Sequence, residues 1–511
     1  MDHMKILHRS PSPQPPSAPA RLTPALARIV ATVSVGFVVT QLDVTIVNVA
    51  LARIGADLHA NVTALQWIVD AYTLAFAVLM LSAGALGDRF GARRIFAAGI
   101  ALFAFASLLC GLAANDALLV AARACQGVGA AAMLPNSLAL LNQSCAHDPK
   151  LRARAVGLWT AAGAISIAAG PVVGGLLIDA FGWRSIFLVN LPLCAAGLAA
   201  TFAWLPKAKP TRTPASEPVA RGIDPLGQVL AVIALTAFTG AVIEWRPLGL
   251  AHPLVAGGLG LALVTALAFI ATERRVATPM LPLALFGNRT FSAAVLFGVC
   301  VNLTYYGVVF VLSLFLQRVR GDTPLQAGLA FLPLTGGFLL SNVASGWVVG
   351  RYGTRVPMLL GALVAALGYG WLLRVGAHTP SWALLLPFLL IPSGMGLAVP
   401  AMTTSVLASV DARRAGTASA VLNTARQAGG AIGVAAFGAL ASGAQAAHIV
   451  NGLHTATAIS AGVLLIAALL ARCVDPHPHA RAQHQAHAQP PGPQRDTPRV
   501  GDHTPCRRHA P

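Results

Sequence analysis

The sequence predicts an all-α protein that crosses a membrane about fourteen times. Of the 511 residues, 56% are hydrophobic and only 10% are charged, and the mean hydropathy of +0.70 lies well above that of soluble domains. Apolar stretches of about 20 residues recur along the chain, each long enough to cross the hydrocarbon core as a helix. The short alternating segments of a membrane β-barrel are absent from the sequence, and lipid cannot satisfy an open backbone.

The spans follow one another with short polar connections. Each boundary is placed to within a few residues, and helices are expected over 29–51, 65–86, 95–114, 117–141, 155–178, 185–204, 226–243, 254–272, 291–316, 326–349, 356–373, 382–408, 417–442 and 453–472.

Basic residues alternate between the connections and so predict the orientation. Lys and Arg are concentrated in one alternate set of connections and are scarce in the other. Because basic loops stay in the cytoplasm, both termini and this set are expected there, at 84–94, 142–154, 205–225, 273–290, 350–355 and 409–416. The same distribution accounts for the net charge of +18 and argues against a nucleic-acid-binding module.

Charged and proline-rich segments predict the domain boundaries. The expected plan is a disordered N-terminus (1–28), a six-helix bundle (29–204), a cytoplasmic linker (205–224), two inserted helices with a loop (225–290), a second six-helix bundle (291–473) and a disordered tail (474–511). The tail holds His477, His479, His484 and His487, for which a solvated segment is favoured over a metal site.

No signature of enzymatic chemistry is present. None of the four lysines follows a glycine, so the chain has no phosphate-binding G-x-x-x-x-G-K, and no hydrolytic signature occurs. The seven cysteines are odd in number and form no C-x-x-C pair. We expect no enzymatic activity and no cofactor or metal, and any work must be driven by a gradient.

Three charged residues inside predicted spans are candidates for proton coupling. Asp43 and Arg123 are expected roughly 12 Å and 9 Å below the outer surface, at 1.5 Å per residue, so they can pair. The alternatives are a structural Asp43 and an Arg123 that extends to the interface. Asp70, near the outer end of the second span, is either a second proton carrier or an interfacial carboxylate that complements the helix dipole.

Two further patterns point to moving parts. The fifth span carries Gly163, Gly170, Pro171, Gly174 and Gly175, a stripe that suits a helix sliding or rocking against a neighbour, although plain close packing gives the same pattern. Polar and aromatic residues in the second half are candidates for lining a substrate cavity, namely Asn302, Tyr305, Tyr306, Asn342, Asn423, Arg426 and Gln427.

The loop 84–94 is expected to be a tight, charged hairpin with a gating role. It concentrates three arginines and an aspartate between two apolar spans, and its glycines permit positive φ. The proposed gating residues are Gly84, Asp88, Arg89, Gly91 and Arg93.

These motifs together resemble the major facilitator superfamily. The hairpin 84–94 is similar to its signature cytoplasmic loop, and the segments 123–131 and 163–175 are similar to signatures of its drug:proton antiporters. The segments 42–51, 182–192 and 416–434 resemble the 14-helix subfamily. The resemblance covers about 29–473 and implies a 6+2+6 arrangement of helices, with inverted repeats in each bundle.

The resemblance implies proton-coupled efflux of small amphipathic or cationic compounds. The expected partners are the substrate, protons and the lipid bilayer, and the expected form is a monomer in the bacterial cytoplasmic membrane. A dedicated exporter or symporter of one metabolite is the alternative. A non-transporting receptor or scaffold is a third reading, and it would not require Asp43 or Arg123.

Overall fold

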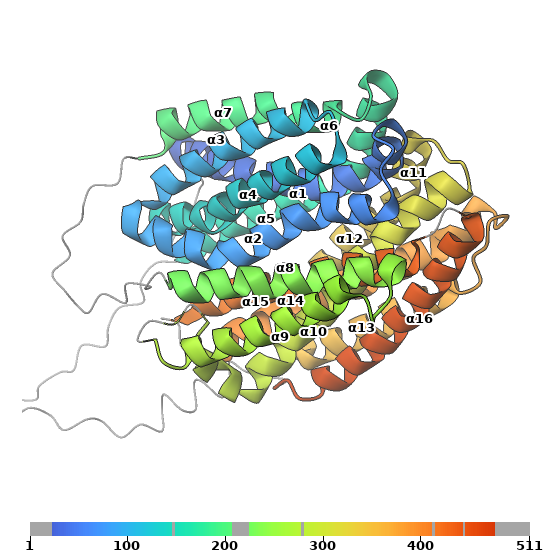
Figure 1. The fold of residues 1–511 in the computed structure, drawn as a ribbon. Helices are drawn as coiled ribbons and strands as arrows, with labels where there is room; N and C mark the ends of the chain where they lie inside the picture. The colour runs from blue at the N-terminus through green and yellow to red at the C-terminus, as the bar shows by residue number, and fades with distance from the viewer. Residues whose placement is uncertain are drawn as a thin grey trace, which may run out of the picture. The chain divides into compact units, whose positions relative to one another are not determined.

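The computed structural model describes residues 23–145, 149–206, 224–276, 279, 281–410, 414–442 and 445–475. All regular elements in these residues are helices, which lie side by side along a common direction (Figure 1). The first nine are α1 (Pro24–Asp57), α2 (Val62–Phe90), α3 (Ala92–Gly111), α4 (Asp116–Ser144), α5 (Pro149–Phe181), α6 (Ser185–Leu188), α7 (Asn190–Trp204), α8 (Pro225–Leu248) and α9 (Pro253–Glu273). The others are η1 (Leu283–Gly287), α10 (Arg289–Leu314), η2 (Phe315–Val319), α11 (Pro324–Ala330), α12 (Leu332–Tyr352), α13 (Arg355–Leu372), η3 (Ser381–Leu384), α14 (Leu385–Ala408), α15 (Ala415–Leu440) and α16 (Ala446–Ala471).

Thirteen helical stretches in the described part are long and apolar enough to cross a membrane. The expected span 417–442 corresponds to α15, which has 26 residues but is not among the thirteen. Its middle turns carry Asn423, Arg426 and Gln427, which lower its hydropathy. In the described residues, fourteen helical stretches are therefore long enough to cross a membrane, and thirteen of them are also apolar enough.

Two sequence-based boundaries were wrong. The first helix starts at Pro24, inside the segment expected to be disordered, because Thr23 caps it by accepting a hydrogen bond from the Leu26 amide at 3.3 Å. The hairpin over 84–94 is instead almost entirely helical, since α2 continues to Phe90 and α3 begins at Ala92. Only Gly91 of this segment has a positive φ, at 96°, and it alone breaks the helix.

Several expectations concern residues outside the described part. Most of the 1–28 segment, most of the 205–224 linker and nearly all of the tail lie there, including His477, His479, His484 and His487. The 6+2+6 division into bundles stays a prediction, although the packing follows it. Among the first seven helices, α4 packs on α2 and α3 while α1 packs on α5 and α7. Among the last, α10 packs on α15 and α16 while α14 packs on α12 and α13.

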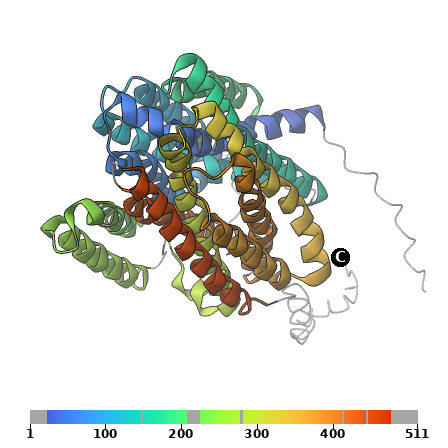
Figure 2. The same ribbon diagram turned by 90° about the vertical axis from the view of Figure 1, so that its right-hand side faces the viewer.

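Helices of the first group (α1–α7) and of the second group (α10–α16) also meet directly. Here α2 packs against α15, and α5 packs against α11 and α12. The inserted helix α8 packs on α9 and on both α2 and α15, so it follows the line where these two helices meet. Figure 2, a view turned by 90°, shows α8 and α9 in green at one side of the other helices.

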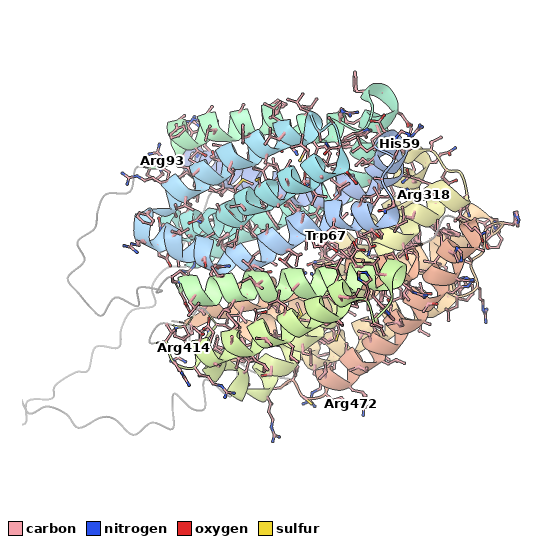
Figure 3. The ribbon with its side chains drawn as sticks, in the orientation of Figure 1. His59, Trp67, Arg93, Arg318, Arg414 and Arg472 are labelled. Carbon is pink, nitrogen blue, oxygen red and sulfur yellow. The ribbon has the colours of Figure 1, made fainter. Side chains whose placement is uncertain are left out.

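The ends of the helices agree with the predicted alternation of loops. Arg93 and Arg414, from loops expected in the cytoplasm, lie at one end of the helices, whereas His59 and Arg318 lie at the other end (Figure 3). We call the end with His59 and Arg318 the outer end. This name follows the charge-based prediction.

Candidate functional site

Asp43 of α1 and Arg123 of α4 form a buried ion pair. Arg123 Nη1 donates to Asp43 Oδ2, and the two side chains are 1% and 0% exposed. The Arg123 Nε also donates to the Ile68 carbonyl of α2 at 3.0 Å. An Arg123 that extends to the interface is therefore excluded in this structure. The predicted pairing of the two residues is confirmed as geometry, and their role in proton coupling stays a prediction.

Amide and hydroxyl groups complete the shell around Asp43. Gln126 Nε2 donates to Asp43 Oδ1 at 2.8 Å, while Gln126 Oε1 accepts from Arg123 Nη1 at 2.7 Å. Asn190 Nδ2 lies 3.4 Å from the same Asp43 oxygen, and Ser107 Oγ accepts from Gln126 at 2.8 Å. A buried charge is stable only when it is paired and hydrogen-bonded, and this network meets both conditions.

Aromatic rings cover the guanidinium of the pair. The Arg123 Cζ lies 4.4 Å from the centroid of the Tyr72 ring and 5.8 Å from that of Phe187. Both rings are buried, so they exclude water while their π faces attract the cation. The network draws on α1, α2, α3, α4, α6 and α7, all in the first group of helices. A rigid movement of that group would leave it intact.

Asp70 has a different environment. It lies eight residues after the start of α2 and is 0% exposed, so the interpretation as an interfacial carboxylate was wrong. Neither of its carboxylate oxygens has a hydrogen-bond partner among the residues that the structure describes. One turn away, Gln66 bonds to carbonyls of α15, which places this stretch of α2 at the contact between the two groups of helices. Asp70 is therefore a buried acid without a local counter-charge in the described structure.

The glycines of α5 pack closely against other helices. A Cβ at Gly170 would lie 1.9 Å from Thr45 Oγ1, and one at Gly163 or Gly174 would meet Phe37 or Ile46 of α1. Gly175 lies against the Leu325 backbone of α11, and Gly328 of α11 lies against the Pro171 carbonyl. The stripe thus serves two contacts, one with α1 and one with α11 in the other group of helices. Its proposed role in antiport stays a prediction.

A central pocket lies between the two groups of helices. It is lined by Thr45, Asn48 and Val49 of α1, Pro171 of α5, Tyr305, Tyr306 and Val309 of α10, and Phe331, Leu334 and Thr335 around α12. The two tyrosine rings meet edge to face at 5.4 Å. The cavity volume is only about 20 Å³ in this conformation, room for about one water. A drug-sized ligand would need the helices to separate.

Arg426 lies beside this pocket. Its Nε donates to Asn302 Oδ1 at 3.1 Å, which joins two of the sequence-predicted cavity residues. In the described structure Arg426 has no carboxylate partner, because the ion pairs there involve other residues. The other cavity candidates do not line the pocket: Asn423 donates to the Ser419 carbonyl of its own helix, and Asn342 and Gln427 are absent from the lining.

The residues of the 84–94 segment hold local contacts. Arg93 donates from Nε to the Thr201 carbonyl at 3.3 Å and from Nη2 to the Phe202 carbonyl at 3.0 Å. These carbonyls lie in the last turn of α7, where a cation is favoured. Arg93 therefore ties α3 to α7 within the first group of helices, and its role in gating stays a prediction. Gly84, Asp88 and Arg89 belong to the last turns of α2.

Sequence reasoning missed several residues of the site. Gln126, Ser107 and Asn190 were not singled out, although Gln126 follows Arg123 by three positions and so lies on the same helix face. Thr45 and Asn48 stand in the motif that contains Asp43 and face the pocket. Ser107 could not be identified from the sequence, because single serines are common in apolar membrane spans.

Comparisons with known proteins agree with this architecture. The chain is 37% identical to the methylenomycin A resistance protein of Streptomyces coelicolor over 83% of its own length and 87% of that protein. It is 38% identical to the multidrug resistance protein Stp of Mycobacterium tuberculosis over 81% and 75% of the two chains. The crystal structure of a D-xylose–proton symporter covers 88% of this chain and 98% of its own, with a TM-score of 0.63 and 14% identity, which shows a shared fold. Residues 33–434 match the sequence model of the Major Facilitator Superfamily, and the chain is a multi-pass membrane protein belonging to that family.

Proposed function

We propose that this protein exports small amphipathic compounds across the bacterial cytoplasmic membrane in exchange for protons. The observation that carries the proposal is the buried Asp43–Arg123 pair, a titratable group held inside the helices of a major facilitator protein. The names of its relatives support drug efflux, since both are called resistance proteins. The protein would act as a monomer with no enzymatic activity.

The central pocket supports an amphipathic substrate. Tyr305, Tyr306 and Phe331 offer aromatic surface, whereas Thr45, Asn48 and Thr335 offer a few polar contacts. When the two groups of helices separate toward the cytoplasm, a flat apolar compound would enter between α1 and α10. Arg426 and Asn302 lie next to Tyr306 and would contact a polar substituent.

Two acids would carry protons. A proton on Asp43 would weaken its bond to Arg123 and release the guanidinium to its other partners, Gln126 and the Ile68 carbonyl. Asp70 would act as the second carrier, because it lies where the two groups of helices meet. Each protonation would bias the equilibrium between conformations open to opposite sides, and substrate would select the deprotonated form.

The α2–α3 segment and the glycine stripe would control the movement. Gly91 is the break between two long helices, and Asp88 and Arg89 lie in the last turn before it. Gly163, Gly170 and Gly174 give α5 a close fit against α1, so small shifts of the pair meet little steric resistance.

Transport in proteoliposomes tests the proposal. The purified chain is reconstituted, a pH gradient is imposed, and accumulation is followed for methylenomycin A and a fluorescent amphiphilic dye. We expect uphill accumulation by the parent, loss of accumulation in Asp43→Asn and Asp70→Asn, and retained downhill exchange in both. If both variants accumulate substrate as the parent does, these acids do not couple transport to protons.

A dedicated exporter is the second candidate, because one relative is named for a single antibiotic and the other for many. The breadth of the compound panel that is transported separates the two. Transport of methylenomycin A alone would favour the dedicated exporter, whereas transport of chemically unrelated compounds would favour multidrug efflux.

A further inference from the structure

Near the outer end of the contact between α2 and α15, one side-chain amide joins the two helices. Gln66 of α2 is fully buried, and its Nε2 donates to the Val434 carbonyl at 3.2 Å and to the Ala435 carbonyl at 2.7 Å. Both acceptors are backbone groups of a helix in the other group. The two hydrogen bonds therefore hold two rigid helices together and do not stabilise either helix by itself.

Gly438 makes room for this side chain. A Cβ at Gly438 would lie 2.6 Å from both Cδ and Nε2 of Gln66 and 2.7 Å from its Cγ. Real Cβ atoms do not approach so closely, so any larger residue at 438 would push Gln66 or the helix away. The glycine thus permits the amide to reach the α15 carbonyls.

The same contact also carries an unfavourable free-energy contribution from an unpaired acceptor. Gln66 Oε1 is buried and has no hydrogen-bond partner among the described residues. An unsatisfied buried acceptor loses its hydration without compensation, and opening the contact would return it to water. The two hydrogen bonds of Nε2 favour the closed contact, and the unpaired Oε1 reduces that preference. The closed contact can therefore open again, as a gate requires.

Other contacts join the two groups at the same end. Ser313 of α10 donates to the Asn48 carbonyl of α1, and Gln317 donates to the Val49 carbonyl at 3.0 Å. The α5–α11 contact is made by backbone atoms packed at Gly175 and Gly328. Gln66 is distinct because Asp70, the buried acid without a partner in the described structure, lies one turn inward on the same helix.

We propose that Gln66 is a latch that keeps the outer α2–α15 contact closed and thereby keeps Asp70 away from outside water. Gln66 would act by holding α2 against α15, so it is a positioning residue. The test below needs no substrate, and its result is separate from the success or failure of the proposed transport function.

Cysteine accessibility tests the latch in intact cells. Ala431 of α15 is 0% exposed and lies one heptad before Gly438, on the same helix face. Ala431→Cys is introduced into the full chain with Cys110 as the only native cysteine retained, and a membrane-impermeant maleimide is added outside. Because Cys110 is fully buried away from this contact, its labelling reports unfolding.

Gln66→Leu and Gly438→Ala are compared with the parent. Leu preserves the bulk of the side chain but cannot donate. It removes both hydrogen bonds and also the unpaired Oε1, so the net effect is smaller than two hydrogen bonds and should raise the labelling rate of residue 431 by about five-fold. Gly438→Ala should raise it too, since the methyl group displaces Gln66. The matched controls are Gln445→Ala, an exposed glutamine at the outer end, and Gly462→Ala, a helical glycine with open space around it. Both controls should label like the parent.

Labelling at residue 431 and at Cys110 together distinguishes an opened contact from an unfolded protein. Faster labelling at 431 with Cys110 still unreactive supports the latch. Unchanged labelling in Gln66→Leu overturns it, because packing would then suffice. If Cys110 reacts in Gln66→Leu, that variant has unfolded, and Gly438→Ala decides with the same two readouts.

Discussion

The Asp43–Arg123 pair gives a quantitative prediction for Asp43→Asn. The substitution removes the charge that compensates a guanidinium of which only 1% is exposed, while Gln126 and the Ile68 carbonyl still accept from Arg123. Breaking a buried ion pair by neutralising one partner costs about 3–5 kcal/mol, since the other charge stays buried. Both side chains are fully buried, so solvent screening does not reduce this figure. Asp43→Asn should therefore destabilise the folded protein strongly.

Asp70→Asn is the matched control. It makes the same chemical change at another fully buried aspartate, but one whose oxygens have no hydrogen-bond partner in the described structure. No ion pair is lost there, and the free energy of unfolding should change by about 1 kcal/mol or less. A third variant, Asp43→Asn with Arg123→Gln, removes both charges and should recover most of the stability lost in Asp43→Asn.

Thermal unfolding of the purified full chain in detergent provides the measurement. The expected order of unfolding temperatures is parent, Asp70→Asn close behind, the double variant next, and Asp43→Asn clearly lowest. If Asp43→Asn and Asp70→Asn unfold at the same temperature, the Asp43–Arg123 pair does not contribute as argued. If the double variant is no more stable than Asp43→Asn, the uncompensated arginine is not the cause.

Three further predictions concern gating, close packing and orientation. Asp88→Asn should slow turnover and leave substrate affinity nearly unchanged, as measured by transport rate and equilibrium binding; a large loss of affinity at normal turnover would contradict a gating role. Gly170→Val should nearly abolish transport because its side chain would overlap Thr45, whereas Gly157→Ala, in open space on the same helix, should transport normally. Arg212→Cys in a cysteine-free chain should react with an impermeant maleimide only in inside-out vesicles, and labelling in intact cells would overturn the predicted orientation.

Local sequence features were enough to predict the fold class and part of the site. Span length and hydropathy follow from what lipid requires of a backbone, so the helices could be predicted one at a time. Asp43 and Arg123 could be paired in advance because depth along a helix is proportional to residue number. The turn at 84–94 was misjudged, since glycines at 84 and 87 permit a turn without requiring one, and helix propagation continued to Phe90.

The rest was decided by which helices become neighbours. Gln66 and Asp70 are one turn apart, and in the sequence both are polar residues near a helix end. Gln66 bonds to the Val434 carbonyl of α15, 368 positions away, whereas the Asp70 carboxylate has no hydrogen-bond partner in the described structure. Neither outcome can be read from spacing, because rotation of α2 about its axis is set by packing on α4, α8 and α15 together. The same holds for Arg93, whose partners at the end of α7 are 108 and 109 positions away. Hydrophobic periodicity determines that a helix forms, whereas the hydrogen-bond partner of a buried polar group is a long-range property that exists only once the helices have packed.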